Sequence, residues 1–157
     1  MSQEQIIQPF KKSIQEIQIV KEPDIEFEQI KIHSSRDVAE LLCSIWPVAL
    51  NYREAFISLN LDRGNKPLSY ALISIGGISS TVVDVKVIMQ HALMSNASSI
   101  IIAHNHPSGN LKASQADLNV TKKVKAACEV MEISLLDHII VTDESGKYYS
   151  FSDESMI

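Results

Sequence analysis

Two histidines separated by one residue stand at the end of an apolar run in the second half of the chain. His104 and His106 follow the apolar residues 100–103, and Pro107 and Gly109 come directly after them. An apolar run of this length is typical of a buried strand, in which side chains at positions i and i+2 leave on the same face. We therefore expect the two imidazoles to point the same way, at a strand end that the proline and the glycine terminate.

A second polar pair, Ser114 and Asp117, opens the helix that the sequence predicts over residues 114–131. Together with His104 and His106, Asp117 would complete a set of three zinc ligands and leave the fourth tetrahedral position open for water. Zinc lowers the pKa of such a water to near neutrality, which makes a nucleophile for a carbonyl carbon. The mechanism also needs a general base and a group that stabilises the oxyanion.

Each half of this pattern also has a purely structural interpretation. Ser114 and Asp117 have the spacing of a helix capping box, in which the two side chains satisfy free backbone N–H groups. A His-x-His sequence at a strand end also arises by chance. The two features together favour a metal site, because a capping aspartate does not need two histidines just before it; the capping interpretation stays open.

The rest of the chain alternates strands with helices. Strands are predicted at residues 54–61, 68–75, 100–104, 135–141 and 148–151, and helices at 35–45, 84–96 and 114–131. This order indicates an α/β fold, a sheet with helices on its faces. Residues 1–33 are polar or show β-like alternation, so we expect an N-terminal extension at 1–33 and one domain at 34–157.

Composition excludes several classes of protein. The hydrophobic fraction is 45%, the charged fraction 21% and the formal net charge −5. No apolar run approaches the roughly 18–20 residues that cross a bilayer, and the N-terminus lacks a secretion signal, so we expect a cytoplasmic protein without a membrane partner. The acidic balance weighs against DNA as the main partner, and we expect Lys122, Lys123 and Lys125 to lie on a solvated helix face.

The spacing His104-x-His106, seven residues, Ser114, two residues, Asp117 resembles the JAMM (MPN+) metalloprotease motif without a gap. The string His-Asn-His-Pro-Ser-Gly at 104–109 is similar to the RadC branch of that superfamily, as are the flanking segments 99–101 and 136–140. The similarity covers residues 34–155.

This resemblance implies a cytidine-deaminase-like JAMM domain, with a mixed β-sheet and flanking helices. It assigns His104, His106 and Asp117 as Zn²⁺ ligands and Ser114 as the residue that steadies the tetrahedral intermediate. The family also has a glutamate at the start of an earlier strand that acts on the water, and Glu54 matches that position. An exposed glutamate at a strand start is the structural alternative for Glu54.

Two functions follow as expectations. The first is a zinc-dependent metallohydrolase that cleaves a peptide or isopeptide bond of an unidentified protein substrate. The second is a metal-binding module of DNA repair or recombination with little or no catalysis. RadC proteins usually carry an N-terminal helix–hairpin–helix region associated with DNA binding, and this chain begins instead with the β-like extension. The sequence leaves the substrate, DNA binding and the oligomeric state open.

Other metal-dependent chemistries do not fit the sequence. A zinc nucleobase deaminase needs His-x-Glu and a Pro-Cys-x-x-Cys pair, which Cys43 and Cys128 do not form. An HNH nuclease spaces its residues along a ββα unit, whereas residues 104–106 are contiguous on one predicted strand. His138 is interpreted as a packed or hydrogen-bonded histidine, with a supporting role behind a metal ligand as the alternative.

Overall fold

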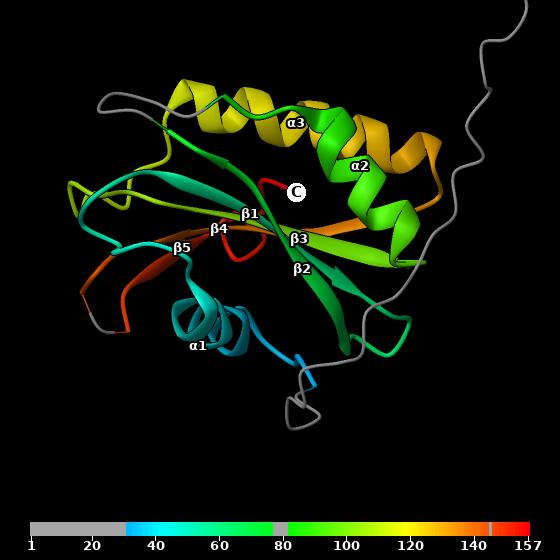
Figure 1. Ribbon diagram of the computed structural model, residues 1–157, viewed down its shortest axis with the longest axis horizontal. Coiled ribbons are helices and arrows are strands. Elements are labelled where there is room, and N and C mark those ends of the chain that lie inside the picture. The colour runs from blue at the N-terminus through cyan, green and yellow to red at the C-terminus, as the bar shows by residue number, and fades with distance from the viewer. Residues whose placement is uncertain (1–30, 77–81, 145) are drawn as a thin grey trace, which may run out of the picture.

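A five-stranded mixed sheet lies at the centre of the computed structural model, which describes residues 31–76, 82–144 and 146–157 (Figure 1). Its strands are β1 (Ala55–Leu61), β2 (Pro67–Ile75), β3 (Ser99–Asn105), β4 (Ser134–Val141) and β5 (Tyr148–Ser150). They lie in the order β2-β1-β3-β4-β5, in which β3 and β4 are parallel and the other neighbours antiparallel. The predicted mixed α/β architecture is confirmed.

Three helices cover the two faces of the sheet. Helix α1 (Ser35–Ile45) lies against one face, and α2 (Val85–Met94) and α3 (Gln115–Val130) lie against the other (Figure 1). Every residue of β1 and β3 is buried, because these central strands have helices on both sides. Alternate residues therefore enter two cores: Ile101 packs on the α1 side, and Ile100 and Ile102 pack beneath α2 and α3.

The packed domain includes Ile32, just before α1. Ile32 is buried in the core on the α1 side, and its N–H donates to the carbonyl of Asn65 in the turn between β1 and β2. Residues 1–30 of the N-terminal extension predicted at 1–33 lie outside the described residues.

A capping box begins α1. The Ser34 hydroxyl accepts from the Asp37 N–H, and the Asp37 carboxylate accepts from the N–H of Ser34.

Replacing Ser34 by alanine leaves an N–H of the first turn without its partner. We expect the free energy of unfolding to fall by about 1 kcal/mol, measured by urea denaturation. Ser44→Ala is the control: it removes a hydroxyl that donates to the Leu41 carbonyl near the other end of α1 and leaves no backbone N–H unpaired. It should change the free energy of unfolding much less, and equal losses would contradict the capping role.

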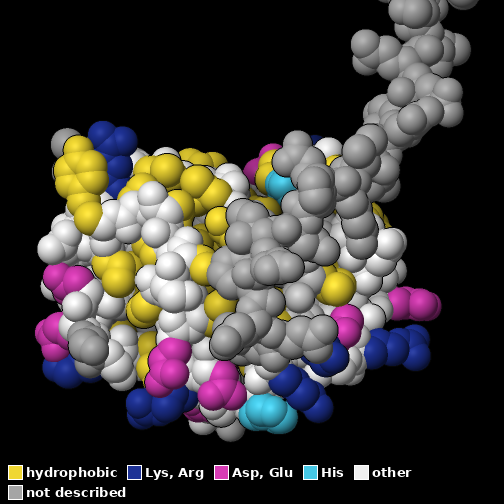
Figure 2. Space-filling view, turned by 60° about the horizontal axis from the view of Figure 1, so that its bottom comes forward, with side chains coloured by type: hydrophobic (Ala, Val, Ile, Leu, Met, Phe, Trp, Pro, Cys, Tyr) yellow, Lys and Arg dark blue, Asp and Glu magenta, His cyan; other side chains and the backbone are white. Residues whose placement is uncertain are grey.

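The described surface mixes charges of both signs. On the face shown in Figure 2, lysine and arginine side chains lie beside aspartates and glutamates along the lower edge and the sides, and hydrophobic side chains gather in the upper and central part. As predicted, Lys122, Lys123 and Lys125 are exposed on α3. Among the described helices, none is both long enough and apolar enough to span a membrane.

Candidate metal centre

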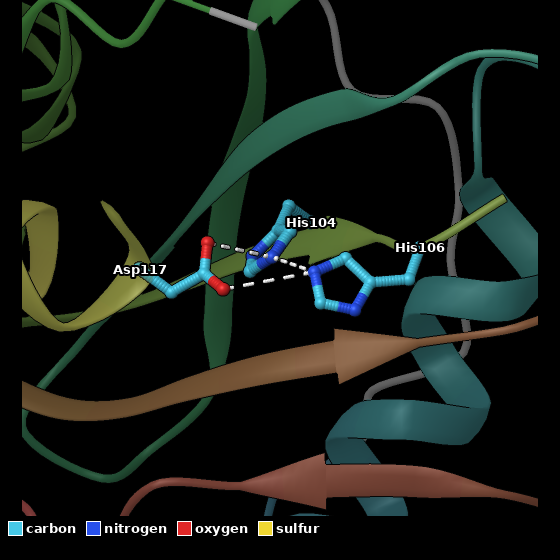
Figure 3. Close-up of side chains that lie close together, drawn as sticks. All are labelled: His104, His106 and Asp117. Atoms are coloured by element: carbon cyan, nitrogen blue, oxygen red, sulfur yellow. Dashed lines mark hydrogen bonds and ion pairs between the residues drawn. The ribbon is translucent and has the colours of Figure 1, made fainter. Parts of the chain in front are cut away.

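The end of β3 and the first turn of α3 bring His104, His106 and Asp117 together. His104 is the penultimate residue of β3 and is fully buried, and His106 is the first residue after the strand. Both rings point toward the Asp117 carboxylate, which enters from the start of α3 (Figure 3). The predicted common orientation of the two imidazoles is therefore present in the structure.

The facing atoms of this triad have the spacing of ligands around one small ion. His104 Nε2 lies 2.9 Å from His106 Nε2 and 3.2 Å from Asp117 Oδ1, and His106 Nε2 lies 3.7 Å from Asp117 Oδ2. A tetrahedral zinc ion with ligands at roughly 2.0–2.1 Å places neighbouring ligand atoms about 3.3 Å apart. The three distances bracket that value.

The loop after β3 fixes which nitrogen of His106 faces the triad. His106 Nδ1 lies against the backbone carbonyl of Asn110, and a carbonyl only accepts, so Nδ1 carries the hydrogen. In the neutral ring, Nε2 then presents a lone pair toward Asp117. The turn that allows this contact includes Gly109, whose φ of +76° suits glycine and whose N–H donates to the His106 carbonyl.

A buried chain of hydrogen bonds fixes His104 in the same way. The Thr121 hydroxyl donates to the Asp117 carbonyl at 2.6 Å, so its oxygen accepts from His138 Nδ1 at 2.6 Å. Burial holds the pKa of His138 well below its usual value, so the ring is neutral and its Nε2 is an acceptor. His104 Nδ1 therefore donates to His138 Nε2 at 2.8 Å, and Nε2 of a neutral His104 is left as a lone pair facing Asp117.

The electrostatics of the triad favour a cation at its centre. Burial raises the pKa of Asp117, but its contacts with His104, His106 and Ser114 more than offset burial and hold it well below the usual value. The contact with Asp117 in turn raises the pKa of His106. Without a proton or a metal ion, two lone pairs at 2.9 Å and a carboxylate would repel one another.

The donor set therefore fits a zinc ion. Two imidazole nitrogens and one carboxylate oxygen lie within 4.8 Å of one another, and both histidines have their other ring nitrogen held by a hydrogen bond. Imidazole and carboxylate ligands with such supporting bonds are those of catalytic zinc sites with an open position.

Glu54 lies on the face of the sheet that carries the triad. It directly precedes β1, two residues before Phe56, and Phe56 is the register partner of His104 and stacks on its ring at 6.0 Å. Residues two apart on a strand share a face. Glu54 is half-buried, and burial raises its pKa while the charges of His104 and His106 lower it. The structure thus brings Glu54 into electrostatic contact with the predicted ligands.

Ser114 is the N-cap of α3 and forms the capping box with Asp117. The Asp117 N–H donates to the Ser114 hydroxyl oxygen at 3.2 Å, and the Ser114 N–H donates to Asp117 Oδ2 at 2.6 Å. The capping interpretation is confirmed. It does not exclude the metal interpretation, since the Asp117 carboxylate also contacts both histidines. The Ser114 side chain also helps to hold the pKa of Asp117 below its usual value.

Comparison with known proteins identifies the family. A sequence model of the RadC-like JAB domain matches residues 32–156. The chain belongs to this family. A UPF0758 protein of Flavobacterium johnsoniae is 43% identical over 126 residues, which cover 80% of this chain and 53% of that relative. A UPF0758 protein of Haemophilus ducreyi is 46% identical over 102 residues, which cover 65% of this chain and 45% of that relative. A UPF0758 protein of Clostridium perfringens is 36% identical over 132 residues, which cover 84% of this chain and 56% of that relative.

The chain thus spans about half the length of the curated relatives that it matches. The family match at residues 32–156 spans the positions of the triad, Glu54 and Ser114. Some proteins with JAB domains are metalloproteases, and the relatives' names state no activity.

The sequence indicated the triad and a possible supporting role for His138, but not Thr121 behind it. From the sequence, His138 is interpreted as packed or hydrogen-bonded, and the structure shows both, since His138 bonds to His104 and stacks on Phe151 at 4.5 Å. Thr121 was not singled out. Its position four residues after Asp117 on the predicted helix was the available signal, because residues at i and i+4 lie on one helix face.

The hydrogen bonds that link Thr121, His138 and His104 predict that substitutions of His138 lower the metal affinity to different degrees. His138→Leu removes the acceptor for His104 Nδ1, and we expect zinc affinity to fall by about 10–100-fold. His138→Gln keeps a side-chain acceptor and should lose less. Competition with a chromophoric chelator measures both affinities, with circular dichroism to confirm folding. Equal affinities in folded Leu and Gln variants would contradict the role of this bond.

Proposed function

We propose that this chain is a zinc-dependent hydrolase of the JAMM type, which cleaves a peptide or isopeptide amide bond with water. The observation that carries the proposal is the convergence of His104, His106 and Asp117, with the Glu54 carboxylate on the same face. The family and the donor set both support zinc as the ion. The substrate is proposed as a protein or peptide of unassigned sequence.

The residues divide the chemistry among them. His104, His106 and Asp117 would hold the ion, which supplies Lewis-acid activation of a water when bound. Glu54 takes a proton from that water as general base and passes it to the leaving amine nitrogen. Ser114 would direct its hydroxyl group toward the oxyanion that develops on the substrate carbonyl.

The environment of Glu54 supports this role. A carboxylate that first accepts and then donates a proton works best with a pKa nearer to neutral than that of an exposed glutamate. Burial moves the pKa of Glu54 in that direction. The histidine charges limit the shift, so Glu54 remains able to ionise.

A chelator-free purification followed by a cleavage assay tests the proposal. The protein is incubated with a library of internally quenched peptides and lysine-linked isopeptides, before and after a chelator removes the metal. We expect cleavage that stops on chelation and returns with Zn²⁺. Cleavage that persists after complete metal removal, or in Glu54→Gln, would contradict the mechanism.

The alternative of a non-catalytic module in DNA repair or recombination has less support. DNA binding relies on basic side chains, and the sequence predicted one basic cluster, the lysines that are exposed on α3. The formal net charge of the chain is −5. DNA binding that weakens steeply with salt would favour this alternative. Loss of cellular function in a Glu54→Gln variant that keeps its zinc would favour catalysis.

A further inference from the structure

Asn105 lies between the two histidine ligands and faces away from them. It is the last residue of β3, and successive side chains on a strand point to opposite faces. Its side chain is completely buried. A buried amide needs partners for its oxygen and its nitrogen, and those of Asn105 all come from one segment, residues 50–55.

The Asn105 amide holds the backbone on both sides of Glu54. The N–H of Ala55 donates to Asn105 Oδ1 at 2.7 Å, and Asn105 Nδ2 donates to the carbonyls of Arg53 at 2.8 Å and Leu50 at 2.7 Å. The two peptide groups that flank the Glu54 Cα are thus bonded to one side chain. On the opposite side, the Gly76 N–H donates to the Glu54 carbonyl at 2.8 Å.

These bonds replace strand pairing at the point where it ends. The pairing of β1 with β3 stops at Phe56 and His104, and Asn105 pairs with Val141 of β4 on its other side. Glu54 therefore lies beyond the last register pair, and the Asn105 amide supplies the described hydrogen bonds that tie its flanking residues to β3. The direction of its side chain depends on the backbone that Asn105 holds.

We infer that Asn105 is the positioning residue that fixes Glu54 over the metal centre. The inference rests on the proposed function. Residues 104–106 then act as one unit: the two histidines hold the metal on one face, while the asparagine between them sets the position of the general base from the other face. The same three residues would therefore position both the metal ion and the general base.

Replacing Asn105 should disturb Glu54 without removing a metal ligand. The probe is Co²⁺, whose visible spectrum reports the coordination sphere, and the readouts are Co²⁺ affinity and the pH midpoint of that spectrum. We expect Asn105→Ala to bind Co²⁺ nearly as well as the wild type, without the loss of about 10–100-fold that follows removal of a group supporting a ligand. We expect its pH midpoint to shift in the same direction as that of Glu54→Gln. Asn105→Thr, which suits a strand, provides a milder variant if Asn105→Ala does not fold.

Asn60 provides the matched control. It is equally buried, on β1, and its amide donates to Ser69 and Ser95 rather than to the segment around Glu54. Asn60→Ala should destabilise the fold in a similar way and leave the pH midpoint unchanged. A midpoint that moves equally in both variants would indicate a general effect of destabilisation and overturn the inference.

A double variant separates positioning from other effects. If Asn105 acts through Glu54, Asn105→Ala should add no shift in a Glu54→Gln background. Additive shifts, or a midpoint that moves in Glu54→Gln and not in folded Asn105 variants, would overturn the inference and leave the proposed function intact. A wild-type protein that binds no Co²⁺, or a midpoint that Glu54→Gln does not move, would overturn the proposed function and the inference with it.

Discussion

Glu54→Gln is expected to abolish most hydrolysis while leaving the metal in place. The amide keeps the size of the side chain but cannot accept and return the proton, and general acid–base catalysis typically contributes about 10²–10⁴-fold to the rate. We therefore expect kcat on any peptide or isopeptide that the wild type cleaves to fall by about that factor, with one zinc still bound. Turnover is measured beside metal content on the same preparation.

The pH profile gives this prediction a sign. Burial raises the pKa of Glu54. As the pH falls, its carboxylate therefore takes up a proton at a higher pH than an exposed glutamate does. The wild-type rate should fall on the acid side with that pKa, and the residual rate of Glu54→Gln should lack this limb. Glu40→Gln, an exposed change on α1, is the control. A variant at Glu54 with normal turnover would exclude it as the base.

His106→Ala is expected to release the zinc. It removes one of three protein ligands, and the remaining histidine and carboxylate form an incomplete site. The half-buried position of His106 makes the change tolerable for the fold. Zinc per chain, measured after purification without a chelator, should fall from one to near zero.

The exposed His33 provides the control for this loss. His33→Ala removes an imidazole outside the triad and should keep a full complement of zinc. Unchanged zinc in His106→Ala would mean that the metal lies elsewhere. A wild type without zinc would mean that the site does not hold it under these conditions and would contradict the proposed cofactor.

The local parts of this site could be predicted from sequence because they follow from periodicity. A buried strand ending in His-x-His determines that both rings share a face, and Ser114 with Asp117 marks the first turn of a helix. The structure confirms the strand, the helix and the capping box. From the sequence, capping and metal binding are alternative interpretations of Asp117. The structure is compatible with both, because Oδ2 accepts from the Ser114 N–H while Oδ1 and Oδ2 face the histidines.

The long-range parts could not be predicted because they depend on strand register. His138 reaches His104 only because β3 and β4 are parallel with Ile102 opposite His138. In the same way, the side of the sheet on which Glu54 lies follows from the pairing of Phe56 with His104. The alternation that brings His104 and His106 together also turns Asn105 away, but nothing near Asn105 in the sequence indicates that its partners lie at residues 50–55.

A zinc-edge anomalous difference map from crystals of the zinc-loaded protein would locate the metal itself. We expect one peak at roughly 2.0–2.2 Å from His104 Nε2, His106 Nε2 and an Asp117 carboxylate oxygen. The fourth position should be filled by solvent, with the Glu54 carboxylate close to that solvent and not bound to the metal. A peak at other residues would contradict the proposed metal site, and Glu54 as the fourth ligand would contradict its role as general base.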